Sequence, residues 1–427
     1  MASTTQSILL RPRPYAQYAG SFYLVALLPP PRQLPSLPSE IWSAVFKFVA
    51  MQPESRALWS LLTVCSMFKE LALPLVYSRV RFSKLPSFEK FVAQLDFAEQ
   101  KWSPIHRIPY STPGRWVQSL DLSRIEYVGQ AEALRLDSLL AKLFYIVPFL
   151  AEFSINPSFL LSRRGMDSLG QRLEAFNIRV LEGISYFPSG SSVEEPLTKL
   201  LRCCPNLEEV EIIGRGPDPA ELDLSIQPPE LSLPESFVAL HLPRLRMLTI
   251  LSVYSSPLLL SLLFSPLPSL QKLTITPYDD IPAALSSRFI AAHGASLRSL
   301  LLFTPKSWPT RLHPSPQTLL RTSPALLHLS LERPLPSQLD FPHENSHLLQ
   351  ILSVPRPDPD FWAALERLLP RLPALRAIRA RDVRWLRRGM GLTAQATGVQ
   401  GEMMEWRRRL LRRGIRLLDG EWKEFEM

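Results

Sequence analysis

The sequence predicts an α/β protein: a short N-terminal unit of three helices, then a curved solenoid with a parallel sheet inside and helices outside. The first observation is a strand-like phrase that recurs ten times between residues 117 and 380, with room for one helix between copies. The second is a group of short apolar helical segments in residues 34–80. The 427 residues are 46% hydrophobic and 20% charged, which is typical of a folded protein rather than a disordered one.

Residues 1–33 are expected to form a disordered, proline-rich leader. Arg11, Arg13 and Arg32 occur there without any acidic residue, so a transit peptide is the alternative. The apolar run at 22–28 is far too short to span a membrane. The chain has three cysteines, too few for a disulfide framework, which favours a reducing compartment such as the cytoplasm or the nucleus.

The segment LPSEIWSAVFKFVA, residues 37–50, predicts the first of three helices in residues 34–80. Pro38 suits the first helical position, and Glu40 suits the positive end of the helix. The large apolar residues form two neighbouring stripes, which are Ile41, Val45, Phe48 and Val49 on one side and Trp42 and Phe46 on the other. A helix that is apolar over so much of its circumference must be covered on two sides.

A second short helix is expected within residues 56–65. Ser66 is expected to cap a third helix, which Pro74 should end because proline removes a helical hydrogen bond. Residues 76–82 alternate like a strand that leads into the repeats, and residues 81–113 should hold a connector helix and cap. Three short helices over about 45 residues bury too little apolar surface to be stable alone. Part of that surface should therefore be covered by something else.

The helical segment resembles the F-box family. The matching positions follow the order and approximate spacing of the family's motif, and they are Leu37-Pro38, Glu40-Ile41, Phe46, Leu61-Leu62, Val64-Cys65, Phe68 and Leu71-Ala72. The direct attachment of such a segment to a repeat array is itself a familiar architecture of that family.

The resemblance implies that these helices dock on the Skp-type adaptor of the Skp–cullin–F-box ubiquitin ligase, and through the adaptor on cullin. The residues that would contact the adaptor are Leu37, Pro38, Ile41, Val45, Leu61, Val64 and Cys65. Phe46, Phe68 and Leu71 would instead hold the three helices together. The alternative is a helical cap that seals the first strand of the repeats, and both roles can hold at once.

Residues 114–390 carry the repeated phrase: apolar, two variable residues, apolar, one variable residue, apolar. Copies lie about 29 residues apart on average and are VQSLDL at 117, LAEFSI at 150, LEAFNI at 173, LEEVEI at 207, LRMLTI at 245, LQKLTI at 270, LRSLLL at 297, LLHLSL at 326, LQILSV at 349 and LRAIRA at 375. Each ends in a period-two alternation, which predicts a strand with one buried face. Prolines shortly before many copies should end the preceding helix.

The phrase resembles the leucine-rich repeat. The asparagine that normally follows the strand is missing from nearly every copy, and the spacing is irregular. The resemblance therefore implies a degenerate leucine-rich-repeat-like solenoid with uneven turns. A unit this small buries its apolar face only by stacking on its neighbours.

The variable residues within each phrase are expected to line the inner face of the solenoid. They change from acidic in the early strands, such as Asp121, through apolar in the middle to basic in the last strand. Leu301 and Phe303 would be large apolar residues exposed side by side, which favours a contact patch over ordinary solvated positions. We therefore expect Leu301, Phe303, Arg379 and Arg381 to bind a protein substrate.

The net charge of +9 has a local source, because fourteen arginines stand against three acids between Arg367 and Arg416. Residues 391–427 are expected to form a basic C-terminal cap that closes the array with a helix and a strand. Such a segment could bind nucleic acid. It lacks interleaved aromatic residues and a groove-reading motif, so nucleic acid ranks below protein as a partner.

One motif points to catalysis. HENSH at 343–347 matches the H-E-x-x-H pattern of zinc peptidases, with Glu344 as base and Glu366 as candidate third ligand. The string sits where the other repeats have the loop before the strand, so a chance match is the better account. We expect no catalytic residue, metal or cofactor, and hence a protein that is not an enzyme.

These features predict a substrate receptor for ubiquitin-dependent degradation that acts through protein–protein interaction and has no membrane partner. The alternative is a leucine-rich-repeat scaffold without a role in ubiquitin transfer, associated with nucleic acid through its arginine-rich C-terminus.

Overall fold

The computed structural model describes residues 37–51, 56–101, 112–172, 174–187, 195–215, 237–253, 256–277, 285–304, 315–341, 346–356, 359–385 and 398–425. The leader expected at residues 1–33 lies outside these ranges. The chain divides into two compact units, Met1–Ala72 and Leu73–Met427, which we name the helical unit and the array.

The helical unit contains α1 (Ser39–Ala50), α2 (Arg56–Leu61) and the first part of α3 (Ser66–Ser78). Helix α1 carries Glu40 in its first turn, as expected, but Pro38 is the N-cap rather than the first helical residue, because its ψ of 148° is extended. Phe46 forms the centre of the unit and is 2% exposed. Its ring lies 5.9 Å from that of Trp42 and 4.9 Å from that of Phe68, between ring centroids. An aromatic cluster therefore holds α1 against α3.

The prediction that Pro74 ends the third helix is wrong, because α3 continues to Ser78. Proline at this position removes the hydrogen bond to the carbonyl of Glu70, four residues earlier, and its ring crowds that carbonyl. Glu70 is exposed, so water is available to that carbonyl. The boundary between the two units falls just before this proline, between Ala72 and Leu73.

The described part of the array contains one twelve-stranded sheet whose strands follow one another in chain order. All paired neighbours are parallel, as predicted. The strands are β1 (Arg79–Arg81), β2 (Ser119–Leu122), β3 (Glu152–Ile155), β4 (Val180–Tyr186), β5 (Glu209–Gly214), β6 (Met247–Leu251), β7 (Lys272–Ile275), β8 (Ser299–Leu302), β9 (His328–Ser330), β10 (Ile351–Val354), β11 (Ala377–Ala380) and β12 (Arg416–Leu418).

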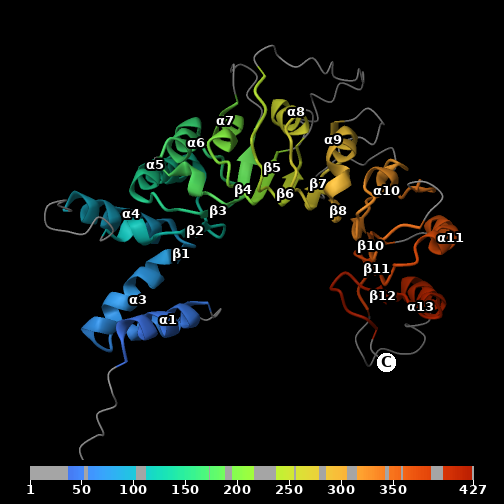
Figure 1. The fold of residues 1–427 in the computed structure, drawn as a ribbon, viewed down its shortest axis with the longest axis horizontal. Coiled ribbons are helices and arrows are strands. Elements are labelled where there is room, and N and C mark those ends of the chain that lie inside the picture. Colours follow the sequence, from blue (N-terminus) through green and yellow to red (C-terminus); the bar gives the residue numbers. More distant parts are fainter. Residues whose placement is uncertain are drawn as a thin grey trace, which may run out of the picture. The chain divides into compact units, whose positions relative to one another are not determined.

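Helices lie between most consecutive strands, and they pack on one another in sequence from α4 to α10. Figure 1 shows α5 to α9 along one side of the strands. We name the opposite side of the sheet the free face. The helices are α4 (Leu85–Gln100), α5 (Gly129–Ile146), α6 (Arg163–Gly170), α7 (Pro196–Arg202), α8 (Pro257–Leu263), α9 (Leu285–His293), α10 (Leu319–Thr322), α11 (Pro359–Leu368) and α13 (Gly398–Leu411). The short 3-10 turns are η1 (Pro113–Trp116), η2 (Ala175–Asn177), η3 (Gly294–Ser296) and η4 (Leu369–Arg371).

Nine of the ten phrases coincide with a strand of this sheet. Their three apolar residues form the core, as in the copy at 270, where Leu270, Leu273 and Ile275 are at most 1% exposed. The strand register aligns them with the same positions of the neighbouring copies. One continuous apolar cluster runs from Leu85 to Leu417, so each repeat is buried by the next.

The copy expected at 173 is wrong: Ala175–Asn177 forms the 3-10 turn η2, and the strand β4 begins at Val180, five residues after Ala175. Here Ile178, just before β4, and Leu181 within it fill the first two apolar positions of the phrase, but Gly183 stands at the third. The register then shifts by one residue, because Leu181 pairs with Val210 and Ile184 with Ile212. This β-bulge brings Ile184 into the core at 1% exposure.

The sheet extends beyond the range expected for the solenoid, residues 114–390, at both ends. Strand β1 pairs with β2, and β12 pairs with β11. Polar side chains that follow some strands form hydrogen bonds with the backbone of the neighbouring repeat. Asn156 Nδ2 donates to the Ile125 carbonyl at 3.0 Å, and Thr276 Oγ1 accepts from the Ser252 N–H at 3.0 Å. Different residue types therefore fill the role that one repeated asparagine would have.

Candidate protein-binding surfaces

The helical unit exposes a set of large apolar side chains beside its aromatic centre. Among the predicted adaptor contacts, Leu37, Ile41, Val45 and Val64 are between 43% and 62% exposed. Pro38 and Cys65 are also exposed, and Leu61 is half-buried. The residues that α1 uses for its own packing and those it leaves uncovered are therefore different.

This separation follows from helix geometry. Successive residues of an α-helix point about 100° apart, so residues spaced by four lie on one side. Ile41 and Val45 share the uncovered side, whereas Trp42 and Phe46 face Phe68. Phe68 and Leu71, expected to hold the helices together, are half-buried.

Part of this uncovered surface was not predicted from the sequence. Met51 and Trp59 are 72% and 62% exposed, and neither was among the expected contacts. Phe48, assigned to the stripe but not to the contacts, is 72% exposed. In α2, Leu58 is buried beside the exposed Trp59. The sequence did offer a signal for this exposure: Trp59 directly follows Leu58, and adjacent residues of a helix point in different directions, so both cannot face the same core.

On the array, the parallel register lines up the side chains of the free face in rows. One row runs through Glu211, Thr249, Thr274, Leu301 and Ser330. An earlier row is polar, since Asp121 lies opposite Ser154, which in turn lies opposite Glu182. Ser154 Oγ donates to Glu182 Oε2 at 2.7 Å. The acidic side chains therefore lie on the early strands, whereas Leu301 is the one large apolar residue in the row from Glu211 to Ser330.

Three of the predicted substrate contacts lie together at the carboxyl ends of the strands. Leu301 is half-buried in β8, and Phe303 directly after it is 44% exposed. The guanidinium of Arg381 reaches back to this point, with Nη1 3.4 Å from the Leu302 carbonyl. Its Nη2 donates to Glu332 Oε1 at 2.6 Å and to the Leu331 carbonyl at 2.9 Å. Arg381 thus also ties the last strands together.

The fourth predicted contact, Arg379 in β11, lies under the C-terminal end of the chain. Its Nη2 donates to the Gly420 carbonyl at 2.5 Å. The Trp422 ring lies over its guanidinium, with 4.3 Å from Cζ to the ring centroid. This part of the free face is therefore occupied within the molecule.

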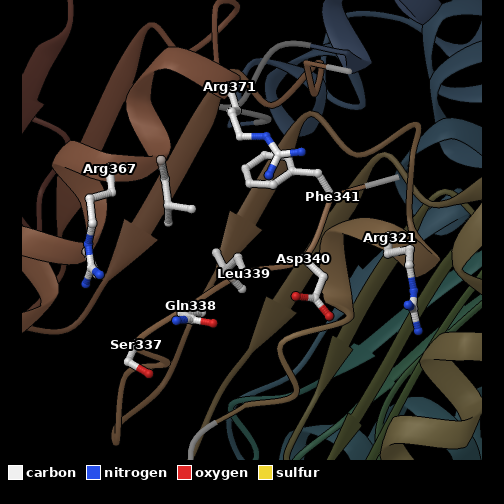
Figure 2. Close-up of a pocket in the computed structure, with 10 residues that line it drawn as sticks. Arg321, Ser337, Gln338, Leu339, Asp340, Phe341, Arg367 and Arg371 are labelled. Atoms are coloured by element: carbon white, nitrogen blue, oxygen red, sulfur yellow. The ribbon is translucent and has the colours of Figure 1, made fainter. Parts of the chain in front are cut away.

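The arginine-rich region also carries a surface hollow of about 470 Å³, lined by residues of α10, residues 337–341, α11 and η4. Arg371 lies over the ring of Phe341, 4.4 Å from Cζ to the centroid. Figure 2 shows Arg321 and Arg367 on opposite sides of the hollow, with Asp340 between them. The guanidinium groups therefore do not converge on one point. In the cap, Arg409 pairs with Glu405 and with Glu366 at 3.4 Å.

The HENSH motif falls partly outside the described residues, which do not include His343 or Glu344. His347 is 2% exposed, with Nε2 3.1 Å from the Ser323 carbonyl and Nδ1 accepting from the Leu349 N–H at 3.1 Å. Both ring nitrogens are therefore engaged in hydrogen bonds, which join the loop before β10 to the end of α10. Within the ranges that the structure describes, no group of three or more His, Cys, Asp or Glu is placed to hold a metal.

Lowering the pH should reduce the free energy of unfolding of the array, because its buried histidines would have to be protonated. Burial, and then the charges of Arg379, Lys272 and Arg381, lower the pKa of His328 to about 4. Burial also lowers the pKa of His293 and of His347. The unfolded chain binds these protons more readily, so this stability is complete above the ordinary pKa near 6.5 and falls as the pH drops toward 4.

We therefore expect the melting temperature to fall by a few degrees between pH 7 and pH 5, measured by differential scanning fluorimetry. The variant His328→Gln should show a shallower fall. A melting temperature that stays level or rises over this interval would contradict the assignment.

No helix in the described ranges is long and apolar enough to cross a membrane. No protein-family model matches the chain, and no curated protein matches it in sequence.

Proposed function

We propose that the chain is the substrate-recognition subunit of a Skp–cullin–F-box ubiquitin ligase. The helical unit binds the Skp-type adaptor, and the free face of the array binds a protein substrate. The observation that carries the proposal is the uncovered apolar side of α1, together with the exposed Val64, in a unit whose aromatic centre is separate. Six of the seven positions that the resemblance assigns to the adaptor contact are exposed, and the seventh, Leu61, is half-buried.

The free energy available from burying these apolar side chains is large enough to support binding of a partner at this surface. Burying an exposed aliphatic side chain stabilises a complex by up to about 1.5–3 kcal/mol. Ile41, Val45 and Val64 are each about half exposed or more, so covering them offers several kcal/mol. A small helical unit that leaves such side chains in water gains most from a partner that covers them.

The decisive variant is Ile41→Asp. A carboxylate buried in an apolar interface without a partner costs at least about 3 kcal/mol, which corresponds to a loss of adaptor affinity of at least about 100-fold. Ile41 is 48% exposed in the unbound chain, so folding should be unaffected. Adaptor binding is measured by biolayer interferometry with purified adaptor, and folding by circular dichroism.

Phe303→Asp is the matched control. Phe303 is 44% exposed and also apolar, but it lies on the array. This variant should bind the adaptor as the unmodified chain does. If Ile41→Asp binds the adaptor undiminished, or if both variants lose it equally, the assignment of the helical unit is rejected.

A further inference from the structure

The last strands of the free face are covered by the chain's own C-terminus, residues 419–425, which we name the strap. Arg379 and His328 point to the free face because their neighbours Ile378 and Leu329 are buried in the core. The Trp422 ring lies over Arg379 and 5.9 Å from the ring of His328, between centroids. Ser353, which pairs with Arg379 in register on the free face, is 0% exposed.

The strap is anchored by its backbone on both sides of Trp422, since the Trp422 N–H donates to the Asp419 carbonyl at 3.1 Å and Trp385 Nε1 donates to the Lys423 carbonyl at 3.0 Å. Asp419 is 3% exposed, and its Oδ1 accepts from the N–H groups of Glu421 at 2.8 Å and Lys423 at 2.9 Å. The Gly420 N–H donates to the Val383 carbonyl at 2.7 Å. Trp422 itself remains 44% exposed and has a φ of 63°. A bulky residue in this left-handed region is strained, and such strain often accompanies a functional role.

The chemistry under Trp422 is that of a receptor for an aromatic and acidic segment. A planar guanidinium binds the face of an aromatic ring, tryptophan best of all. Lys272, Arg379 and Arg381 place positive charge around the neutral His328, although the charge of Arg381 is paired with Glu332 at 2.6 Å. The strap carries two carboxylates close to Trp422 in sequence, Glu421 and Glu424. The Glu421 carboxylate itself pairs with Arg384 at 3.3 Å and with Lys423 at 2.7 Å.

We propose that this basic end of the free face is a docking slot for an aromatic residue flanked by carboxylates in a protein partner. Trp422 fills the slot until the partner displaces it. That the partner is the substrate of a ubiquitin ligase rests on the proposed function, whereas the slot itself does not. Because the strap is tethered, its effective concentration is of the order of millimolar, and it should suppress a competing segment strongly.

The test uses a fluorescein-labelled peptide with the strap's own sequence, DGEWKEF, and the full-length chain. The peptide should bind the Trp422→Gly variant at least tenfold more tightly than the unmodified chain, measured by fluorescence anisotropy. Glycine removes the competing ring and suits the positive φ. If this variant does not fold, Trp422→Leu provides the same comparison with the side-chain volume partly kept.

Two controls define the slot. The peptide DGEAKEF should not bind either protein, and Arg379→Ala in the Trp422→Gly background should abolish binding of DGEWKEF. Equal affinity for the unmodified chain and the Trp422→Gly variant, failure to bind either, or binding that survives Arg379→Ala overturns the proposal.

Adaptor binding, measured on the same proteins, separates this proposal from the proposed function. Trp422→Gly should leave adaptor binding unchanged, and Ile41→Asp should leave peptide binding unchanged. If the Trp422→Gly variant binds the adaptor but not the peptide DGEWKEF, the slot is rejected and the proposed function is unaffected. If Ile41→Asp still binds the adaptor, only the ubiquitin-ligase assignment is rejected.

Discussion

Replacing Gly183 with alanine is expected to destabilise the array by at least about 4 kcal/mol. A Cβ atom at this position would lie 2.0 Å from the carbonyl oxygen of Ile155. That oxygen belongs to the neighbouring strand β3, so the clash is with backbone rather than with a flexible side chain. Gly183 also has a φ of 70°, which adds about 1 kcal/mol or more for a residue with a side chain. Relief of the clash would require opening the bulge that places Ile184 in the core.

Gly129→Ala is the matched control for this experiment. Gly129 has a φ of 75°, close to that of Gly183, but a Cβ there would meet nothing within 4 Å. It should therefore show only the conformational cost of about 1–2 kcal/mol. Urea denaturation followed by circular dichroism measures both. Equal losses for the two variants would show that β4 does not approach β3 as described.

The fold was predictable from the sequence wherever the local pattern and the stacking agree. Copies such as those at 245 and 270 place three apolar residues at the spacing that a buried strand needs, and their neighbours repeat the spacing. The copy at 173 has the same spacing of apolar residues, yet residues 175–177 form a turn. The actual strand was hidden because Gly183 stands where the pattern requires an apolar side chain. A bulge restores the pairing, and a bulge depends on the adjacent strand, which single-sequence periodicity does not include.

The candidate binding surfaces also differ in how much of them the sequence could predict. Exposure of Ile41 and Val45 follows from the periodicity of one helix, so the sequence could predict it. The environments of Arg379 and Arg381 could not be predicted, because they depend on contacts with Gly420 and with Leu302, 41 and 79 residues away in the chain. The sequence could rank these arginines as residues of the free face. It could not show that one ties strands together and that the other lies under a tryptophan.

Phe46→Ala is expected to unfold the helical unit and leave the array intact. Removing a fully buried phenylalanine ring costs about 3–5 kcal/mol, and Phe46 contacts both Trp42 and Phe68 at the centre of the unit. A unit of this size has only a few kcal/mol of stability to lose. Hydrogen–deuterium exchange should therefore rise sharply in peptides from residues 39–72, and it should stay unchanged in peptides from residues 247–302.

The control for this variant lies two residues away on the same helix. Phe48→Ala removes the same atoms, but Phe48 is 72% exposed, so exchange in residues 39–72 should change little. The two variants together test whether the apolar residues of α1 serve two separate purposes. If Phe48→Ala unfolds the unit as Phe46→Ala does, the whole circumference of α1 is needed for its own packing and no side is left for an adaptor. If only Phe46→Ala does so, the side that carries Ile41, Val45 and Phe48 is free for an adaptor to cover.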